Sequence, residues 1–117
     1  MASYRELKVW QRAMELVVLV YELTKKFPKD ELYGLVSQIR RSVISLPSNI
    51  TEGQGRQSSK DFKQFLSIAR ASLNELETQI EIANRLNYID KFESDRISEI
   101  TTEVGKMING LRSSLQF

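Results

Sequence analysis

Apolar residues recur at intervals of three and four along almost the whole chain, which is the spacing of one face of an α-helix. Four such segments are expected, over residues 7–27, 30–52, 58–86 and 90–115. No segment alternates apolar and polar residues as a half-buried strand would. Because the connections are short, neighbouring helices should pack antiparallel. The pattern therefore predicts an all-α fold, an antiparallel up-down-up-down four-helix bundle that forms a single domain over residues 1–117.

The first segment carries two adjoining apolar rows. The inner row comprises Val9, Ala13, Leu16, Val20, Leu23 and Phe27. The second row comprises Trp10, Met14, Val17 and Tyr21. A face this wide indicates that the helix is central to the bundle or that a partner covers it on a second side. Pro28 should end the helix, because proline disfavours the helical conformation of the residue before it.

The second segment should begin near Asp30, a good capping residue that Glu31 follows in the first turn. Its inner row comprises Leu32, Leu35, Val36, Ile39, Val43, Leu46 and Ile50. Since this row continues past Pro47, the helix should reach about Glu52.

Pro47 should kink the second helix, because its ring crowds the carbonyl of Val43 and removes one backbone donor. The Val43 carbonyl then needs another donor, which water or the side chains of Ser48 and Asn49 would supply.

The third segment should open at Ser58 or Ser59, and Ser58 with Asp61 three residues on resembles a capping box. Its inner row comprises Phe62, Leu66, Ala69, Leu73, Leu76, Ile80 and Ala83. The pattern breaks at residues 87–90, and the fourth helix should start near Asp90. The fourth inner row comprises Ile97, Ile100, Val104, Met107 and Leu111.

The stretch "EGQGR", residues 52–56, separates the second and third helices. A phosphate-binding loop of the common kinds follows a strand and needs a third glycine or a Gly-Lys-Ser/Thr ending, and this stretch has neither. Gly53 fits the left-handed residue that closes a helix, and Gly55 adds a flexible link. Pro47, Asn49, Gly53 and Gly55 are therefore expected to form a structural kink and turn.

The composition excludes most enzyme classes. The chain has 117 residues and contains neither cysteine nor histidine, so it lacks the thiolate nucleophile, the commonest general base and the commonest metal ligand. Glu77 and Glu81, like Glu99 and Glu103, stand one turn apart, yet without histidine they are expected on a solvated face. We expect no enzyme activity, no cofactor and no bound metal.

No membrane partner is expected either. The N-terminus lacks a basic start with an apolar run and a cleavage site, so no signal peptide is predicted. The longest strongly apolar run, from Leu16 to Tyr21, is far shorter than a membrane span. A cytoplasmic location is expected.

Positive charge is concentrated in the first part of the chain. Residues 1–73 hold 12 Lys and Arg against 7 Asp and Glu, whereas residues 74–117 hold 5 against 8. The candidates for contact with nucleic-acid phosphates are Arg40, Arg41, Arg56, Lys60 and Lys63. Such contact is one interpretation, and a solvated helix face is the other.

A polar strip on the second helix leaves a further alternative open. The strip comprises Gln38, Arg41, Ser45, Ser48 and Glu52. Its small side chains would let another backbone, or a phosphate, approach closely. Arg41 or Arg56 would equally well pair with Glu52, and the sequence does not separate pairing from phosphate contact.

Four stretches together resemble a known family. They are "LKVWQRAMELV", "FPKDELYGLVSQIRRSVISLPSNITEGQGR", "FLSIARASLNELETQI" and "GKMINGLRSSL". They resemble, in order and over nearly the whole chain, the four-helix-bundle proteins encoded in intervening sequences of bacterial 23S rRNA genes. Thr51 stands where the usual pattern has alanine. The fold is also similar to the accessory variability protein of diversity-generating retroelements, a basic homopentamer associated with nucleic-acid binding and a reverse transcriptase.

The resemblance implies a non-enzymatic bundle that assembles as a homopentamer and binds nucleic acid. We therefore expect an oligomeric accessory protein whose partners are copies of itself and RNA or DNA, with a protein partner left open. The alternative function is a self-assembling protein–protein interaction scaffold whose basic residues only solvate it.

Overall fold

The computed structural model describes residues 3–115, which fold into four long helices and two short 3₁₀ turns. The helices are α1 (Lys8–Thr24), α2 (Leu35–Gln54), α3 (Ser59–Arg85) and α4 (Lys91–Ser114). The 3₁₀ turns are η1 (Tyr4–Glu6) and η2 (Lys29–Glu31). The expected all-α fold with four helices is confirmed. Residues 1–2 and 116–117 of the expected domain lie outside the described residues.

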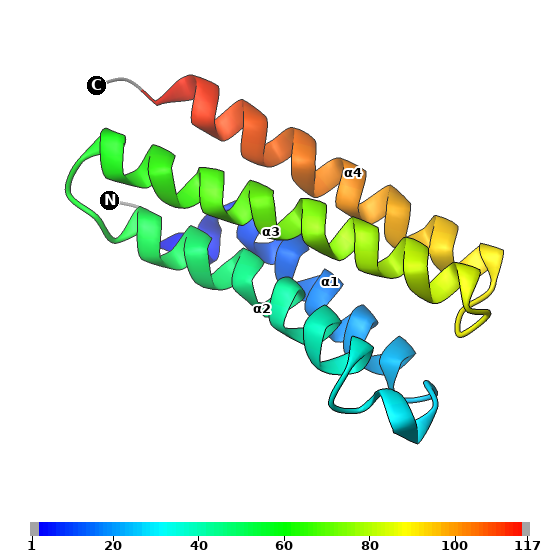
Figure 1. Ribbon diagram of the computed structural model, residues 1–117. Coiled ribbons are helices and arrows are strands. Elements are labelled where there is room, and N and C mark those ends of the chain that lie inside the picture. Colours follow the sequence, from blue (N-terminus) through cyan, green and yellow to red (C-terminus); the bar gives the residue numbers. More distant parts are fainter. Residues whose placement is uncertain (1–2, 116–117) are drawn as a thin grey trace.

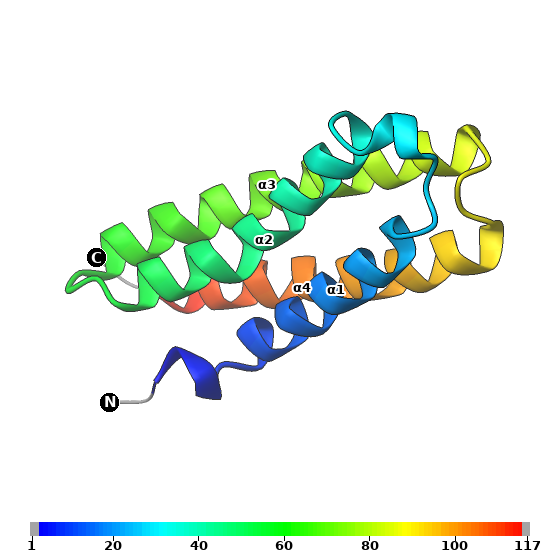
Figure 2. The ribbon, with the colours of Figure 1, turned by 90° about the horizontal axis from the view of Figure 1, so that it is seen from below.

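Successive helices run in alternate directions, so that both chain ends and the α2–α3 turn lie at one end of the bundle (Figure 1). The helices form two layers, α1 with α4 and α2 with α3 (Figure 2). Each helix contacts the two beside it, and α2 and α3 pack together most extensively. The bundle is elongated, with extents of 45 × 24 × 20 Å.

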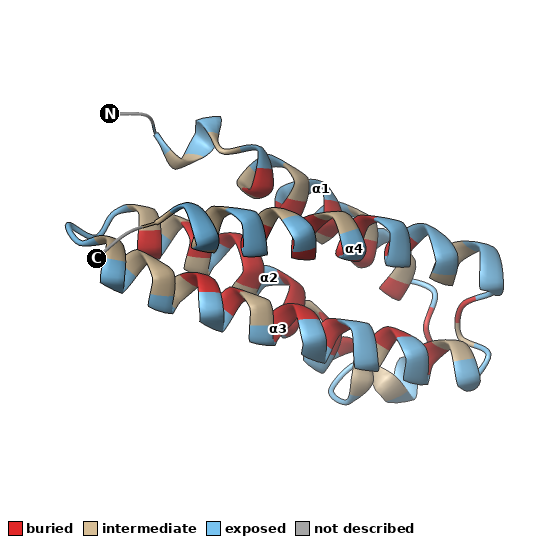
Figure 3. Ribbon diagram, turned by 90° about the horizontal axis from the view of Figure 1, so that it is seen from above, coloured by how far each residue is buried: buried red, intermediate tan, exposed pale blue. Residues whose placement is uncertain are grey.

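The core lies along the inward faces of all four helices (Figure 3). Most members of the expected inner rows are buried there, among them Leu16, Val20, Ile39, Val43, Leu46, Ile50, Leu66, Leu73, Leu76, Ile97 and Val104. Leu32 is an exception, because its side chain is 48% exposed. Its exposure follows from a late start of α2.

The expected start of α2 at Asp30 is wrong. Residues Lys29–Glu31 form the short turn η2, and α2 begins only at Leu35, after Gly34. Glu31 explains the shift, because its carboxylate accepts a hydrogen bond from the Leu35 amide (3.3 Å) and another from the Tyr88 hydroxyl (2.8 Å). The bond to Glu31 also raises the pKa of Tyr88. Glu31 thus satisfies a first-turn amide of α2 from outside the helix.

The end of α1 at Thr24 comes three residues before the expected one. The Thr24 hydroxyl donates to the Val20 carbonyl at 2.9 Å and so satisfies an acceptor in the last turn. Phe27 is nevertheless buried, with its ring 5.3 Å from that of Tyr88. The inner row of α1 therefore continues into the loop.

Pro47 does not interrupt α2, which runs on to Gln54. The expectation that the helix continues past Pro47 is confirmed, whereas the size of any kink stays a prediction. Of the donors considered for the Val43 carbonyl, which are water, Ser48 and Asn49, the structure argues against Asn49. The Asn49 amide instead donates to the carbonyl and the hydroxyl of Ser45, both at 2.8 Å.

Gly53 does not end α2 in a left-handed conformation, because it lies inside the helix and no described glycine has a positive φ. A Cβ added at Gly53 would lie 2.7 Å from the Phe65 Cβ and 2.8 Å from a ring carbon of Phe62. The glycine is needed for close packing against α3. Gly55 follows as the C-cap of α2, with φ −78°.

The caps of α3 and α4 follow the sequence. The Ser58 hydroxyl accepts from the Asp61 amide at 3.1 Å, which is one half of the expected capping box. Asp90 and Glu93 form a complete capping box at the start of α4. Between the two helices, Asn87 has a φ of 64°, in the left-handed region where asparagine is well tolerated.

Candidate nucleic-acid interface

The two arginines in the middle of α2 have different environments. The Arg40 guanidinium donates to the Thr24 hydroxyl at 3.0 Å and lies 4.4 Å from the ring centroid of Tyr21. Arg40 therefore helps to attach α2 to α1. Arg41 is exposed and has no partner within residues 3–115. Only Arg41 of this pair presents its whole guanidinium to solvent.

Arg56 contacts other side chains of its own chain. Its guanidinium donates to the Glu52 carboxylate at 2.6 Å and lies 4.8 Å from the ring centroid of Phe65. Of the two interpretations left open for Arg56, the structure contains the pairing with Glu52. Arg41 makes no such pair.

At Ser45, the polar strip on α2 lies against another helix. The Ser45 hydroxyl lies 2.8 Å from that of Ser72, so α3 takes the space that the small side chain leaves. Arg41, one turn before Ser45, lies far along the bundle from Lys60 and Lys63 at the start of α3. The five candidate residues therefore do not form one cluster.

Charge is distributed unevenly along the bundle. We define the basic end as residues 3–15, 47–71 and 103–115, the half that contains both chain ends and the α2–α3 turn (Figure 1). It carries nine Lys and Arg against five Asp and Glu, whereas the other half carries eight against ten. Lys60 is exposed in this half without a partner among the described residues, and Lys63 is half-buried there.

Sequence reasoning missed three basic residues that lie along α3 and α4 at this end. Arg70 and Lys106 line one groove between the two helices, and Arg112 follows further along α4. Two signals were available in the sequence. Arg70 follows Lys63 by seven residues, and Gly105 is a glycine within a segment that otherwise has helical periodicity.

A second groove, between α1 and α2, is mostly apolar. Its lining residues are Tyr4, Trp10, Met14, Val17, Ile44, Pro47, Ser48 and Thr51. It includes three members of the second apolar row of α1. That row is only partly covered by the bundle, and Met14 and Ile44 are 38% and 42% exposed.

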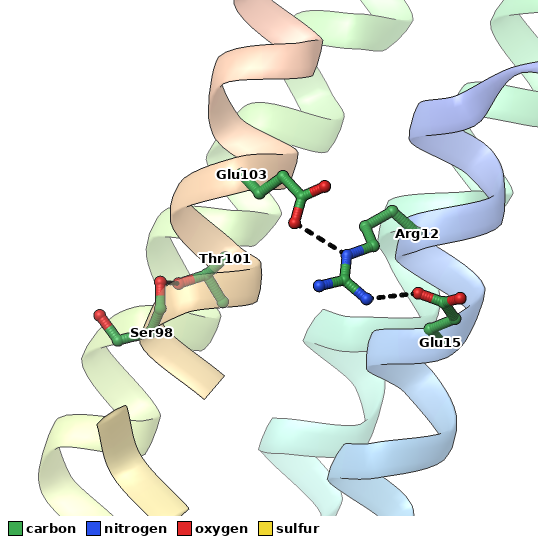
Figure 4. A network of polar contacts seen from close by, with 5 residues as sticks. All are labelled: Arg12, Glu15, Ser98, Thr101 and Glu103. Atoms are coloured by element: carbon green, nitrogen blue, oxygen red, sulfur yellow. Dashed lines mark hydrogen bonds and ion pairs between the residues drawn. The ribbon is translucent and has the colours of Figure 1, made fainter. Parts of the chain in front are cut away.

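The paired glutamates occupy different environments. The Arg12 guanidinium bridges Glu15 of its own helix (2.5 Å) and Glu103 of α4 (2.9 Å), as Figure 4 shows. Its hydrogen bonds to Glu15 and Glu103 raise the pKa of Arg12. Glu81 pairs with Arg85 at 2.8 Å. Within residues 3–115, no group of three or more acidic side chains is arranged to hold a metal ion.

In the described part of the chain, none of the helices is both long and apolar enough to cross a lipid bilayer.

Comparisons with known proteins agree with this architecture. A protein of unknown function from the S23 ribosomal protein family of Bacteroides thetaiotaomicron VPI-5482 has a similar crystal structure, with a TM-score of 0.84. It is 29% identical in sequence, over 91% of this chain and 99% of that chain. No curated protein sequence matches. Residues 5–110 match the family described as 23S rRNA-intervening sequence protein, and since this match spans most of the chain, the chain belongs to that family.

Proposed function

We propose that this is a cytoplasmic, non-enzymatic accessory protein that assembles with copies of itself and binds RNA or DNA through its basic end. The uneven distribution of charge along the bundle carries this proposal. An end with nine basic against five acidic side chains attracts a phosphate backbone whatever its sequence. Such binding would position a nucleic acid without reading its bases.

Lys8 and Lys60 support the proposal most directly. Both side chains are exposed at the basic end, and neither has a partner among residues 3–115. Arg40 and Arg56 support it less, because their guanidinium groups already contact neighbouring side chains.

The apolar groove between α1 and α2 supports self-association. In a monomer this groove would leave Met14 and Ile44 in water beside the half-buried rings of Tyr4 and Trp10. A second copy would bury them. A homopentamer is the proposed assembly, and that subunit number rests on the resemblance alone.

A protein-interaction scaffold is the second candidate function. The contacts of Arg40 with Thr24 and of Arg56 with Glu52 favour it, because they show basic residues of the candidate set acting within the fold. In this case a protein partner would occupy the α1–α2 groove, and nucleic acids would bind only weakly.

Charge reversal distinguishes the two functions. Lys8→Glu with Lys60→Glu should weaken binding of labelled single-stranded RNA and duplex DNA alike, with the larger loss at low salt. The matched control is Lys29→Glu with Arg96→Glu, which reverses two unpaired exposed charges in the other half of the bundle. Equal binding by both double variants at two salt concentrations would favour the scaffold.

Self-association needs its own test. Met14→Glu with Ile44→Glu places charges in the α1–α2 groove and should lower the mass measured by light scattering. Val18→Glu serves as the control, because Val18 is 60% exposed on α1 and does not line the groove. A parent protein that is monomeric at micromolar concentration would refute the assembly.

A further inference from the structure

Gly105 lies buried in the middle of α4, where a glycine costs roughly 1 kcal/mol of helix stability relative to alanine. A Cβ at this position would lie 2.1 Å from a terminal nitrogen of Arg70 and 3.3 Å from its guanidinium carbon. The Arg70 guanidinium therefore rests against bare backbone of α4. The glycine creates the space that this charged group occupies.

The Arg70 side chain lies against Gly105, and no carboxylate among the described residues is paired with its charge. Its side chain is half-buried, and within residues 3–115 it makes no hydrogen bond, ion pair or ring contact. Its nitrogens are not among the buried atoms that lack a partner, which are Gln79 Oε1 and Arg112 Nε in the described residues. The guanidinium donors therefore remain accessible from solvent.

The groove around Arg70 contains further donors. Lys106 and Asn109 line it from α4, and Thr102 adds a hydroxyl. Glu77 is the one acidic residue among the residues that line it, and it forms no ion pair with Arg70 or Lys106. The groove is thus lined by two cations, an amide and a hydroxyl, and neither cation is ion-paired with its one carboxylate, that of Glu77.

We infer that this groove binds an oxyanion, a phosphate group that Arg70 holds through two parallel N–H donors with Lys106 and Asn109 beside it. The inference deepens the proposed function. It rests on that function for the source of the phosphate, which would be a nucleic-acid backbone.

The basic side chains continue from the groove toward the end of the bundle. Arg112 follows Gly105 by seven residues and Lys63 precedes Arg70 by seven, so in antiparallel helices both lie about 10 Å further along. Arg112 is half-buried, and its Nε is closed to solvent, so only the rest of its guanidinium could contact a phosphate. The α3–α4 seam thus offers a track for successive phosphates.

The test combines three probes, which are inorganic phosphate, a glutamate-rich peptide and a labelled single-stranded RNA, with three single variants of the full chain. Inorganic phosphate is titrated at constant ionic strength while the backbone amide signals of residues 101–109 are followed by NMR. A labelled single-stranded RNA is titrated by fluorescence anisotropy. Arg70→Gln removes the charge, and Gly105→Ala displaces the guanidinium. Arg85→Gln is the control, since Arg85 is an exposed arginine of α3 that pairs only with Glu81.

Phosphate should shift the Gly105 and Lys106 amides of the parent protein, and much less in Arg70→Gln and Gly105→Ala. RNA affinity should fall about tenfold in both variants, as expected for one lost bidentate pair. Arg85→Gln should stay within about twofold, as a solvent-exposed pair contributes little.

The outcomes separate the inference from the proposed function. If phosphate shifts the groove amides but neither the parent protein nor any variant binds RNA, the groove is a site for free phosphate and the proposed function fails. If RNA binds equally to Arg70→Gln and Arg85→Gln, the inference is overturned and the proposed function stands. Shifts produced by a glutamate-rich peptide but not by phosphate would also overturn it, in favour of a protein carboxylate.

Discussion

Gly53 in α2 and Gly105 in α4 are both buried glycines inside long helices, yet they face different neighbours. Gly53 lies against the ring of Phe62 and the Cβ of Phe65, so its missing side chain lets α2 and α3 pack closely. Gly105 lies under the guanidinium of Arg70, so its missing side chain makes room for a charge. Glycine therefore permits close packing at the α2–α3 seam, the line along which these two helices meet. At the α3–α4 seam it leaves room for a polar side chain.

The two seams also differ in whether their polar side chains have partners. At the α2–α3 seam the hydroxyls of Ser45 and Ser72 satisfy each other at 2.8 Å. At the α3–α4 seam Arg70 and Lys106 line a groove without partners among the described residues. The α2 and α3 helices pack together most extensively, whereas the α3–α4 seam leaves two basic side chains without partners among the described residues and is the surface that we propose for binding.

The largest effect is expected from Gly53→Ala. The added methyl group would overlap the Phe65 Cβ, which is fixed to the backbone of α3, so overpacking should cost about 2–3 kcal/mol of unfolding free energy. Urea denaturation followed by circular dichroism measures it. Gly110→Ala is the control, because nothing lies within 4 Å of a Cβ there, and it should stabilise the protein by about 0.5–1 kcal/mol. Equal effects at the two sites would contradict the packing role of Gly53.

Removing the hydroxyl pair should have an intermediate effect. Ser45→Ala leaves the buried Ser72 hydroxyl without its partner and should cost about 1 kcal/mol, whereas Ser72→Ala should cost less, because Asn49 still donates to the Ser45 hydroxyl. A double-mutant cycle should give a coupling energy near 0.5–1 kcal/mol. A coupling energy of zero would mean that the two helices do not depend on this contact.

Gly105→Ala should change stability by less than about 1 kcal/mol. The gain in helix propensity is offset by moving the flexible end of Arg70 and, by a few tenths of an ångström, Leu73. Urea denaturation beside Gly53→Ala is the direct comparison of the two seams. A loss as large as that at Gly53 would show that Arg70 is part of the packed core.

The smallest effect on stability is expected at the ion pair between Lys26, which follows the end of α1, and Glu93 in the first turn of α4. The hydrogen bond from Lys26 lowers the pKa of Glu93, so the pair stabilises the fold above the ordinary carboxyl pKa of 4.5 and loses this contribution as the pH falls through the lowered value. Lys26→Met should cost about 0.5 kcal/mol at pH 7 and nothing at pH 2. Denaturation at the two pH values checks the sign, and an equal loss at both would rule out the ion pair as its cause.

The hydrophobic pattern was sufficient for the helices and the core, because periodicity reports burial directly. It failed at the start of α2, since the carboxylate of Glu31 is held by Tyr88, 57 residues away, and acts on Leu35 from outside the helix. It also failed at Gly53, where the constraint comes from Phe62 and Phe65 on another helix.

The candidate site was less predictable than the fold. The charges of Arg40 and Arg56 make them candidates for phosphate contact, yet their contacts with Tyr21 and Phe65 depend on packing between helices. Arg70 could not be singled out from the sequence, because its position depends on Gly105 of the opposite helix. Only the register of α3 and α4 brings the two residues together.

The salt dependence of RNA binding tests the central claim most directly. For the parent protein and for Arg70→Gln, the dissociation constant of a single-stranded RNA is measured between low and physiological salt. If Arg70 contacts a backbone phosphate, the variant should bind more weakly, and its slope against the logarithm of salt concentration should be smaller by about 0.7. An unchanged affinity and slope in a folded Arg70→Gln variant would contradict the assignment of the α3–α4 groove to phosphate.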